Sequence, residues 1–145
     1  MSSNIREFQI GVKTFGQKNV PGLVREFRDA IALAGLDGFV LLTIVDTGRA
    51  RGNWQTTIGT PAEGEIEVTD YSGRGQEGYT VIDTDSVGKA VVATATDPYA
   101  PIWYHNGVPY IGFINDGTDK IPAVHMLERT VERLVRTFKR WKGGR

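Results

Sequence analysis

The stretch Val45–Gln55, with the sequence VDTGRARGNWQ, marks the point where the pattern of the chain changes. Before it, the apolar run 21–44 has helical character, and after it alternating segments and glycine turns follow. Asp46 and Thr47 can hydrogen-bond the backbone that follows them, and Gly48 tolerates a positive φ angle. The stretch therefore predicts a tight corner between a helix and a strand, with Asp46, Thr47 and Gly48 as its structural residues.

The residues before the corner predict a long amphipathic helix. Apolar side chains recur at helical spacing over 23–34, after Asn19 as an N-cap and Pro21 in the first turn. The apolar run 39–45 is compatible with a continuation of this helix or with a buried strand. Periodicity does not separate these two structures in so short a run.

The residues after the corner predict short antiparallel strands. Eighteen glycines favour many turns, a hairpin-like connection at 59–64 joins the first two strands, and Asn106-Gly107 is a strong signal for a tight two-residue turn. The polar, glycine-rich stretch 70–78 predicts a flexible loop. The candidate strands are 54–58, 65–69, 79–82, 90–95 and 102–105, with an edge strand or an arm at 8–12 within residues 1–19.

The C-terminal segment predicts an amphipathic helix that begins at Pro122 and ends near Gly143. An arginine stripe lies about half a turn away from its apolar stripe. Such a stripe is most often a solvated face, and the alternative is a contact surface for phosphates or acidic protein. The apolar stripe is Leu127, Val131, Leu134, Phe138 and Trp141, and the arginine stripe is Arg129, Arg133, Arg136 and Arg140.

The composition is that of one soluble globular domain over residues 1–145, with 40% apolar residues. Seventeen basic and seventeen acidic residues cancel in number but not in position. Residues 63–97 hold eight acids and two bases, whereas residues 126–145 hold seven bases and two acids, so one part of the chain can attract another copy. We expect an α+β fold, with an N-terminal and a C-terminal helix packed on a mostly antiparallel β-sheet.

No motif supports an enzyme, a cofactor site or a metal site. The chain has no cysteine, which excludes disulfides and thiolate chemistry. Gly73–Gly78 matches the glycine pattern of a dinucleotide-binding loop but lacks the preceding strand and the following helix. His105 and His125 have no partner at metal-ligand spacing. The N-terminus lacks the apolar core of a signal peptide, and no run is apolar enough to span a membrane, so we expect an unexported, soluble protein.

Two segments resemble the tail completion, or neck, proteins of tailed bacteriophages, the gene-product-ten-like tail-component family. The corner VDTGRARGNWQ is similar to that family's P-V-D-T-G-R signature, which follows a long N-terminal helix and leads into the first strand. Residues 102–132 follow the order of the family's N-N-x-P-Y, G-x-S and P-A blocks. The matching segments are YHNGVPYI at 104–111, INDGT at 114–118 and IPA at 121–123.

The resemblance covers about a third of the chain directly and favours a helix for residues 39–44. Ile44, Gly107 and Thr118 depart from the family pattern, where proline, asparagine and serine are usual. These departures affect assignment to a subfamily more than membership of the family. The acidic region from Glu63 to Ala100 carries no motif of the family, so the resemblance says nothing about partner surfaces there.

The resemblance implies a virion structural protein without catalysis, assembled in the host cytoplasm into a ring in the phage neck. Its partners would be copies of itself, with six-fold symmetry favoured over twelve-fold, together with the connector and tail-terminator or tail-tube proteins. DNA would pass through the lumen without sequence-specific binding, and no membrane is involved. Candidate contacts for subunits, partners or DNA are Arg49, Arg51, Arg129, Arg133, Arg136 and Arg140.

Two alternatives stay open. In the first, the arginine stripe lines the connector lumen and touches DNA. In the second, which belongs to a different functional class, the chain is a small-ligand-binding enzyme that uses Gly73–Gly78.

Overall fold

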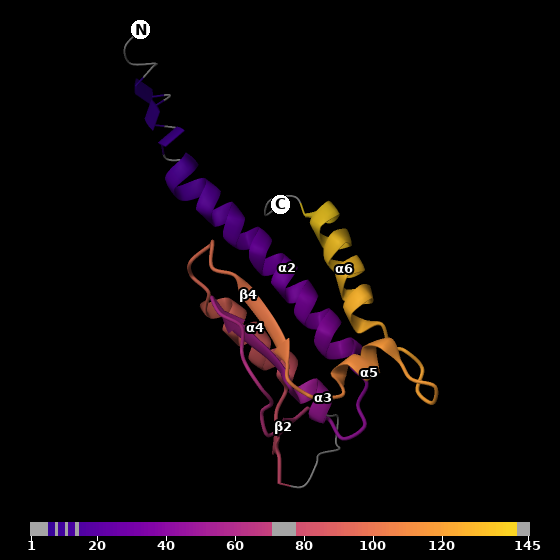
Figure 1. Cartoon of the computed structure of the whole chain (residues 1–145). Helices are drawn as coiled ribbons and strands as arrows, with labels where there is room; N and C mark the ends of the chain where they lie inside the picture. Colours follow the sequence, from indigo (N-terminus) through magenta and orange to yellow (C-terminus); the bar gives the residue numbers. More distant parts are fainter. Residues whose placement is uncertain (1–5, 8, 11, 14, 71–77, 142–145) are drawn as a thin grey trace.

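The computed structural model describes residues 6–7, 9–10, 12–13, 15–70 and 78–141. The elements are η1 (Phe15–Asn19), α2 (Val20–Leu42), α3 (Arg49–Gly52), β1 (Trp54–Ile58), β2 (Val68–Thr69), β3 (Thr80–Val81), α4 (Thr84–Thr94), β4 (Ile102–Asn106), α5 (Ile111–Asp116) and α6 (Met126–Arg140). Helix α2 lies between α6 on one side and the strands with α4 on the other (Figure 1). The predicted α+β fold class is confirmed.

Helix α2 is one continuous helix of 23 residues, which confirms the predicted N-terminal helix. The run 39–45 continues this helix as far as Leu42, and Thr43 then takes an extended conformation with φ −70° and ψ 122°. Asn19 does not cap the helix: its backbone is itself helical, because the π-helical turn η1 runs directly into α2. The N-cap prediction for Asn19 is therefore wrong.

The residues before η1 are helical wherever the structure describes them, at 6–7, 9–10 and 12–13. The interpretation of 8–12 as an edge strand is therefore wrong for the described residues. This N-terminal part extends beyond the other elements, in line with α2 (Figure 1).

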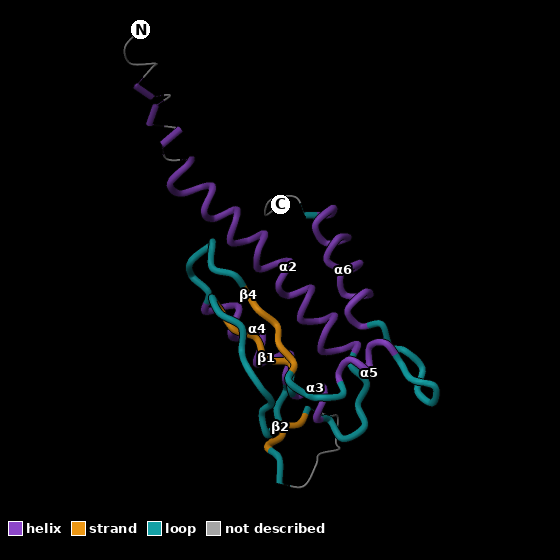
Figure 2. The backbone as a smooth tube through the Cα atoms, viewed as in Figure 1, coloured by secondary structure: helices purple, strands orange, loops and turns teal. Residues whose placement is uncertain are grey.

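The main sheet has two strands that are distant in sequence. β1 pairs antiparallel with β4, with Trp54 opposite Asn106 and Ile58 opposite Ile102 (Figure 2). β2 and β3 form a separate parallel pair. The predicted hairpin through 59–64 is wrong, because β1 finds its partner in β4 and the backbone N–H of Gly59 donates to the carbonyl of Pro101 at 2.9 Å.

Two other local predictions are corrected. Residues 90–95, predicted as a strand, belong to α4 up to Thr94, and this helix begins where the Asp83 carboxylate accepts from the Ser86 amide at 3.1 Å. Asn106-Gly107, where a tight turn was predicted, is followed by no second strand within residues 108–141. Gly107 is required for a different reason: a Cβ atom there would lie 1.9 Å from the carbonyl oxygen of Gly64.

Helix α6 begins four residues after Pro122, which corrects the predicted start. The chain first runs alongside α5, where the amides of Val124 and His125 donate to the carbonyls of Ile114 and Asn115 at 3.1 and 2.9 Å. His125 then adopts the left-handed conformation with φ 53°, and Met126 starts the helix. The helix ends at Arg140, and Gly143, its predicted end, lies outside the described residues.

The core joins α2, β1 and α6. Leu36, Val40, Trp54 and Met126 form a buried cluster, and the Trp54 ring stacks on Phe39 with a centroid separation of 4.8 Å. Met126 brings the start of α6 against the end of α2 and the start of β1. The three elements meet at this one point of the fold, next to the predicted corner.

Candidate interaction site

The corner is built around the backbone of Gly48. Its φ of 80° confirms the predicted positive angle, and its carbonyl oxygen accepts from the amides of Gly52 and Asp70, both at 2.9 Å. The Thr47 hydroxyl accepts weakly from the Arg49 amide at 3.4 Å. Asp46 and Thr47 themselves are exposed. The corner therefore holds α3 against the C-terminal end of β2.

Arg49 forms an ion pair at the surface with Glu65 of the same chain. Its Nη2 donates to Glu65 Oε2 at 2.7 Å, its Nε also donates to Glu65, and its guanidinium lies 5.6 Å from the centre of the Tyr110 ring. The hydrogen bonds with Glu65 raise the pKa of Arg49, and the same bonds lower the pKa of Glu65. Arg49 therefore ties α3 to the connection between β1 and β2.

Arg51 closes the C-terminal end of α2. Its Nη2 donates to the Thr43 carbonyl at 2.9 Å and more weakly to the Leu41 carbonyl at 3.5 Å. The last carbonyls of a helix have no partner within the helix, so a guanidinium at this position satisfies them. Arg49 and Arg51 therefore both have partners within the chain, and their role as contact residues stays a prediction.

Asn53, the turn residue before β1, is fully buried and makes three hydrogen bonds. Its Nδ2 donates to the carbonyls of Arg49 and Ile66 at 2.9 and 3.1 Å, and its Oδ1 accepts from the Ile66 amide at 2.8 Å. The side chain thus connects the corner to the segment before β2. The local sequence around Asn53 carries no signal for this distant partner.

Helix α6 presents three different faces, of which the first is buried on α2. Met126 and Thr130 are 1% and 0% exposed, and Leu134 is half-buried beside them. The contact is close because α2 carries glycines there: a Cβ atom at Gly38 would lie 2.5 Å from the Thr130 hydroxyl oxygen, and one at Gly35 would lie 3.6 Å from Leu134.

The residues of the predicted apolar stripe do not share one environment. Phe138 and Trp141 contact Phe27 of α2, with ring centroids 5.4 and 5.0 Å apart. Leu127 and Val131 are exposed instead, because the face on α2 contains the residue before each of them. The second face of α6 is therefore an exposed apolar row that differs from the predicted stripe, because it contains Val135 in place of Leu134 and Trp141. We call this row the α6 apolar stripe. Its members are Leu127, Val131, Val135 and Phe138, and their exposed fractions are 45%, 56%, 46% and 61%.

The third face of α6 is the predicted arginine stripe, on the flank opposite the α6 apolar stripe. All four arginines are exposed, and three of them line a shallow cleft of about 220 Å³ with Leu42 and Glu132. Within the described part of the chain, none of the four forms an ion pair. The members of this arginine flank are Arg129, Arg133, Arg136 and Arg140.

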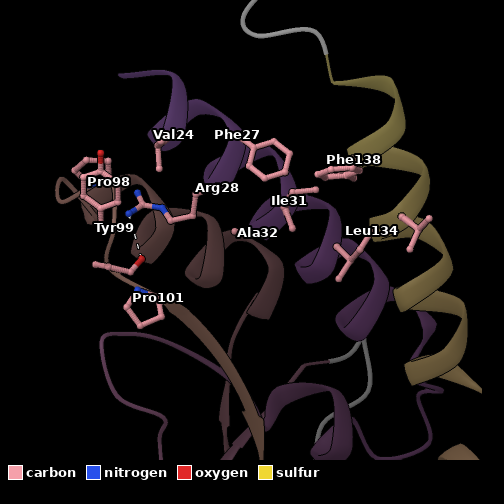
Figure 3. Close-up of a pocket in the computed structure, with 12 residues that line it drawn as sticks. Val24, Phe27, Arg28, Ile31, Ala32, Pro98, Tyr99, Pro101, Leu134 and Phe138 are labelled. Atoms are coloured by element: carbon pink, nitrogen blue, oxygen red, sulfur yellow. Dashed lines mark hydrogen bonds between the residues drawn. The ribbon is translucent and has the colours of Figure 1, made fainter. Parts of the chain in front are cut away.

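An open apolar groove of about 670 Å³ lies between α2, α6 and the loop before β4 (Figure 3). Phe27 and Ile31 of α2 form one part of its wall, Tyr99 and Pro101 another, and Phe138 closes the α6 side. The single charged side chain of the lining, Arg28, is engaged within the chain through Asp29 and the carbonyl oxygens of Ala95, Asp97 and Ala100. The groove thus offers an apolar surface to a ligand or partner.

Other candidate chemistry finds no assembled site in the described ranges. His105 lies in β4 with its Nε2 3.1 Å from the Gly64 carbonyl oxygen, and His125 precedes α6. No group of three or more potential metal-ligating side chains gathers among the described residues. The Gly73–Gly78 loop lies, except for Gly78, outside them. None of the described helices combines the length and apolar content needed to cross a lipid bilayer.

Comparison of the chain with protein-family models, curated proteins and solved structures finds no match. The likeness to phage neck proteins therefore depends on the two motif segments alone.

Proposed function

We propose that this chain is a virion structural protein of a tailed bacteriophage, and that it forms a ring in the neck which joins the head connector to the tail around the DNA passage. The proposal starts from the corner and the 102–132 blocks, whose residues and order resemble the neck-protein family. The structural observation that supports a ring is a pair of unlike surfaces on opposite sides of α2.

These two surfaces differ in charge. α6 packs on α2 at Gly38 and displays the arginine flank, whereas α4 packs on the other side of α2, where Gly88 meets Leu36 (Figure 1). Copies with two unlike, complementary surfaces associate head to tail, and such a contact gives a closed ring when its rotation closes. The exposed acids on the α4 side are Asp83 and Asp97, with Glu63 and Glu67 in the connection between β1 and β2.

Mass photometry and negative-stain microscopy of the purified protein test ring formation. We expect rings of the unmodified protein at low salt. Arg133→Glu with Arg136→Glu should weaken assembly at least about 10-fold, because like charges then face each other across the contact. Lys120→Glu, a reversal at an exposed loop lysine, is the control and should assemble normally.

A second measurement concerns the particle itself. We expect the protein in purified virions by mass spectrometry, and a labelled copy at the neck by imaging. Absence from virions, together with a protein that forms no ring at any concentration, would contradict the proposed function. Duplex DNA binding with a steep salt dependence that Arg133→Glu and Arg136→Glu abolish would favour the DNA-contacting alternative instead.

A further inference from the structure

The α6 apolar stripe is a surface that no described element covers. Leu127 and Phe138, its end members, are eleven residues apart, which is about three helical turns, so they lie on nearly the same line along α6. Val135 and Phe138 also line the apolar groove, so the stripe and the groove share these two residues. Figure 3 shows Phe138 on the α6 side of the groove. A contiguous exposed apolar surface of this kind marks a binding site for another molecule.

The edge of the α6 apolar stripe that is further from α2 carries one charged side chain at each end. Glu128 follows Leu127 and Lys139 follows Phe138, so these two are likewise about three turns apart and share one edge. The Glu128 side chain is 57% exposed and is 3.2 Å from Asn115 Nδ2 and 3.9 Å from His125 Nδ1. Lys139 is exposed and forms no ion pair within the described part of the chain.

We propose that the α6 apolar stripe binds the same stripe of a second copy, with the two α6 helices antiparallel. A two-fold axis at the middle of the stripe then sets Leu127 opposite Phe138 of the second copy, and Val131 opposite Val135. The same axis sets Glu128 of each copy opposite Lys139 of the other copy, which gives two Glu128–Lys139 contacts. In a parallel two-fold pair the charged edges of the two copies would lie on opposite sides of the contact, so Glu128 and Lys139 of the two copies would not meet. The two Glu128–Lys139 contacts form only in the antiparallel pair, so the charges favour that orientation.

This pairing goes beyond the neck function and does not depend on it. It uses the flank of α6 opposite the arginine flank, and it is symmetric, with the same surface on both copies. A two-fold pair has two equivalent ends, whereas a joint between head and tail has two different ends. The pair is therefore a state of the free protein, in which the apolar stripe is shielded from water.

Sedimentation velocity over a concentration series tests the pairing. We expect a monomer–dimer equilibrium at high salt, because one helix face is a small interface and its apolar contacts do not depend on charge screening. Val131→Glu should raise the dimer Kd at least about 10-fold, since it places a carboxylate in the apolar contact. Val87→Glu is the matched control: this valine is 51% exposed on α4, and its replacement should leave the Kd unchanged.

The orientation is tested by charge reversal at the edge. Lys139→Glu should weaken the dimer, because Glu128 of the second copy then faces a like charge, and the addition of Glu128→Lys should restore it. Because the chain has no cysteine, introduced cysteines report the register directly. Chains with Val131→Cys should form a disulfide with chains that carry Val135→Cys, whereas chains with Leu127→Cys should not form one with each other.

Two outcomes would overturn the pairing. One is a protein that stays monomeric at every concentration while circular dichroism shows it folded. The other is a dimer that Val131→Glu leaves intact. Neither outcome tests the ring, because ring formation is measured by mass photometry and microscopy, by the presence of the protein in virions and by the arginine variants. Each proposal can therefore be contradicted without the other.

Discussion

At the scale of single residues, Thr43 and Thr130 are equally buried but differ in the hydrogen bonding of their hydroxyl groups. Both are 0% exposed. The Thr43 hydroxyl accepts from Trp54 Nε1 at 2.7 Å and donates to the Phe39 carbonyl at 2.6 Å, so it links α2 to β1. The Thr130 hydroxyl has no hydrogen-bond partner among the residues that the structure describes, although it lies in the closest part of the α2–α6 contact.

The same substitution at these two positions should therefore change stability in opposite directions. Thr43→Val leaves the Trp54 N–H buried without an acceptor and should lower the free energy of unfolding by about 1–3 kcal/mol. Thr130→Val keeps the side-chain shape, removes an unpartnered hydroxyl and should raise the free energy of unfolding by about 1 kcal/mol. Urea unfolding of the two variants measures both values. An equal decrease in the free energy of unfolding for both variants would contradict this explanation.

At the scale of elements, the connection between β1 and β2 is held mainly by its contacts with the corner. Glu65 binds Arg49 of α3, and the backbone of Ile66 binds Asn53. This connection contributes few apolar side chains to the core. The position of β2 therefore depends on polar contacts, and one of them, the Arg49–Glu65 ion pair, contains a titratable carboxylate.

The Arg49–Glu65 pair should make stability depend on pH. Arg49 holds the pKa of Glu65 below its ordinary value of 4.5, so the pair stabilises the fold above that pH. This contribution is lost as the pH falls through the lower, folded-state pKa. Glu65→Gln should cost up to about 1 kcal/mol at neutral pH, and the difference from the unmodified protein should vanish in acid.

Thermal unfolding at a series of pH values measures this difference. Glu63→Gln, at a nearby exposed carboxylate, is the control and should follow the unmodified protein throughout. A difference between Glu65→Gln and the unmodified protein that stays constant down to acid pH would show that the ion pair is not its cause.

At the scale of the whole molecule, the two flanks of α6 should give two assemblies that salt separates. From about 0.1 M to about 1 M salt the Debye length falls from roughly 10 Å to roughly 3 Å. Ring assembly through the arginine flank should weaken over this range, whereas pairing through the α6 apolar stripe should persist. Light scattering at both salt concentrations checks this, and loss of both assemblies in parallel would show that one surface serves for both.

The amino-acid sequence alone determined the features that depend on neighbours within a few residues. The helical period of apolar side chains predicted α2 and α6, and glycine in the corner predicted the positive φ angle of Gly48. The β-prone segments at β1 and β4 were also predicted as strands. Backbone conformation and periodicity are local properties, so a local pattern is sufficient for them.

Only the tertiary structure decided which surfaces meet. β1 pairs with β4 rather than with the next strand, and residues 90–94 are helical because they pack on α2 as part of α4. α6 turns Thr130 towards Gly38 and leaves Leu127 exposed, and Arg49 and Arg51 are bound within the chain. These outcomes depend on shape and on partners distant in sequence, which a local apolar or charged pattern does not specify.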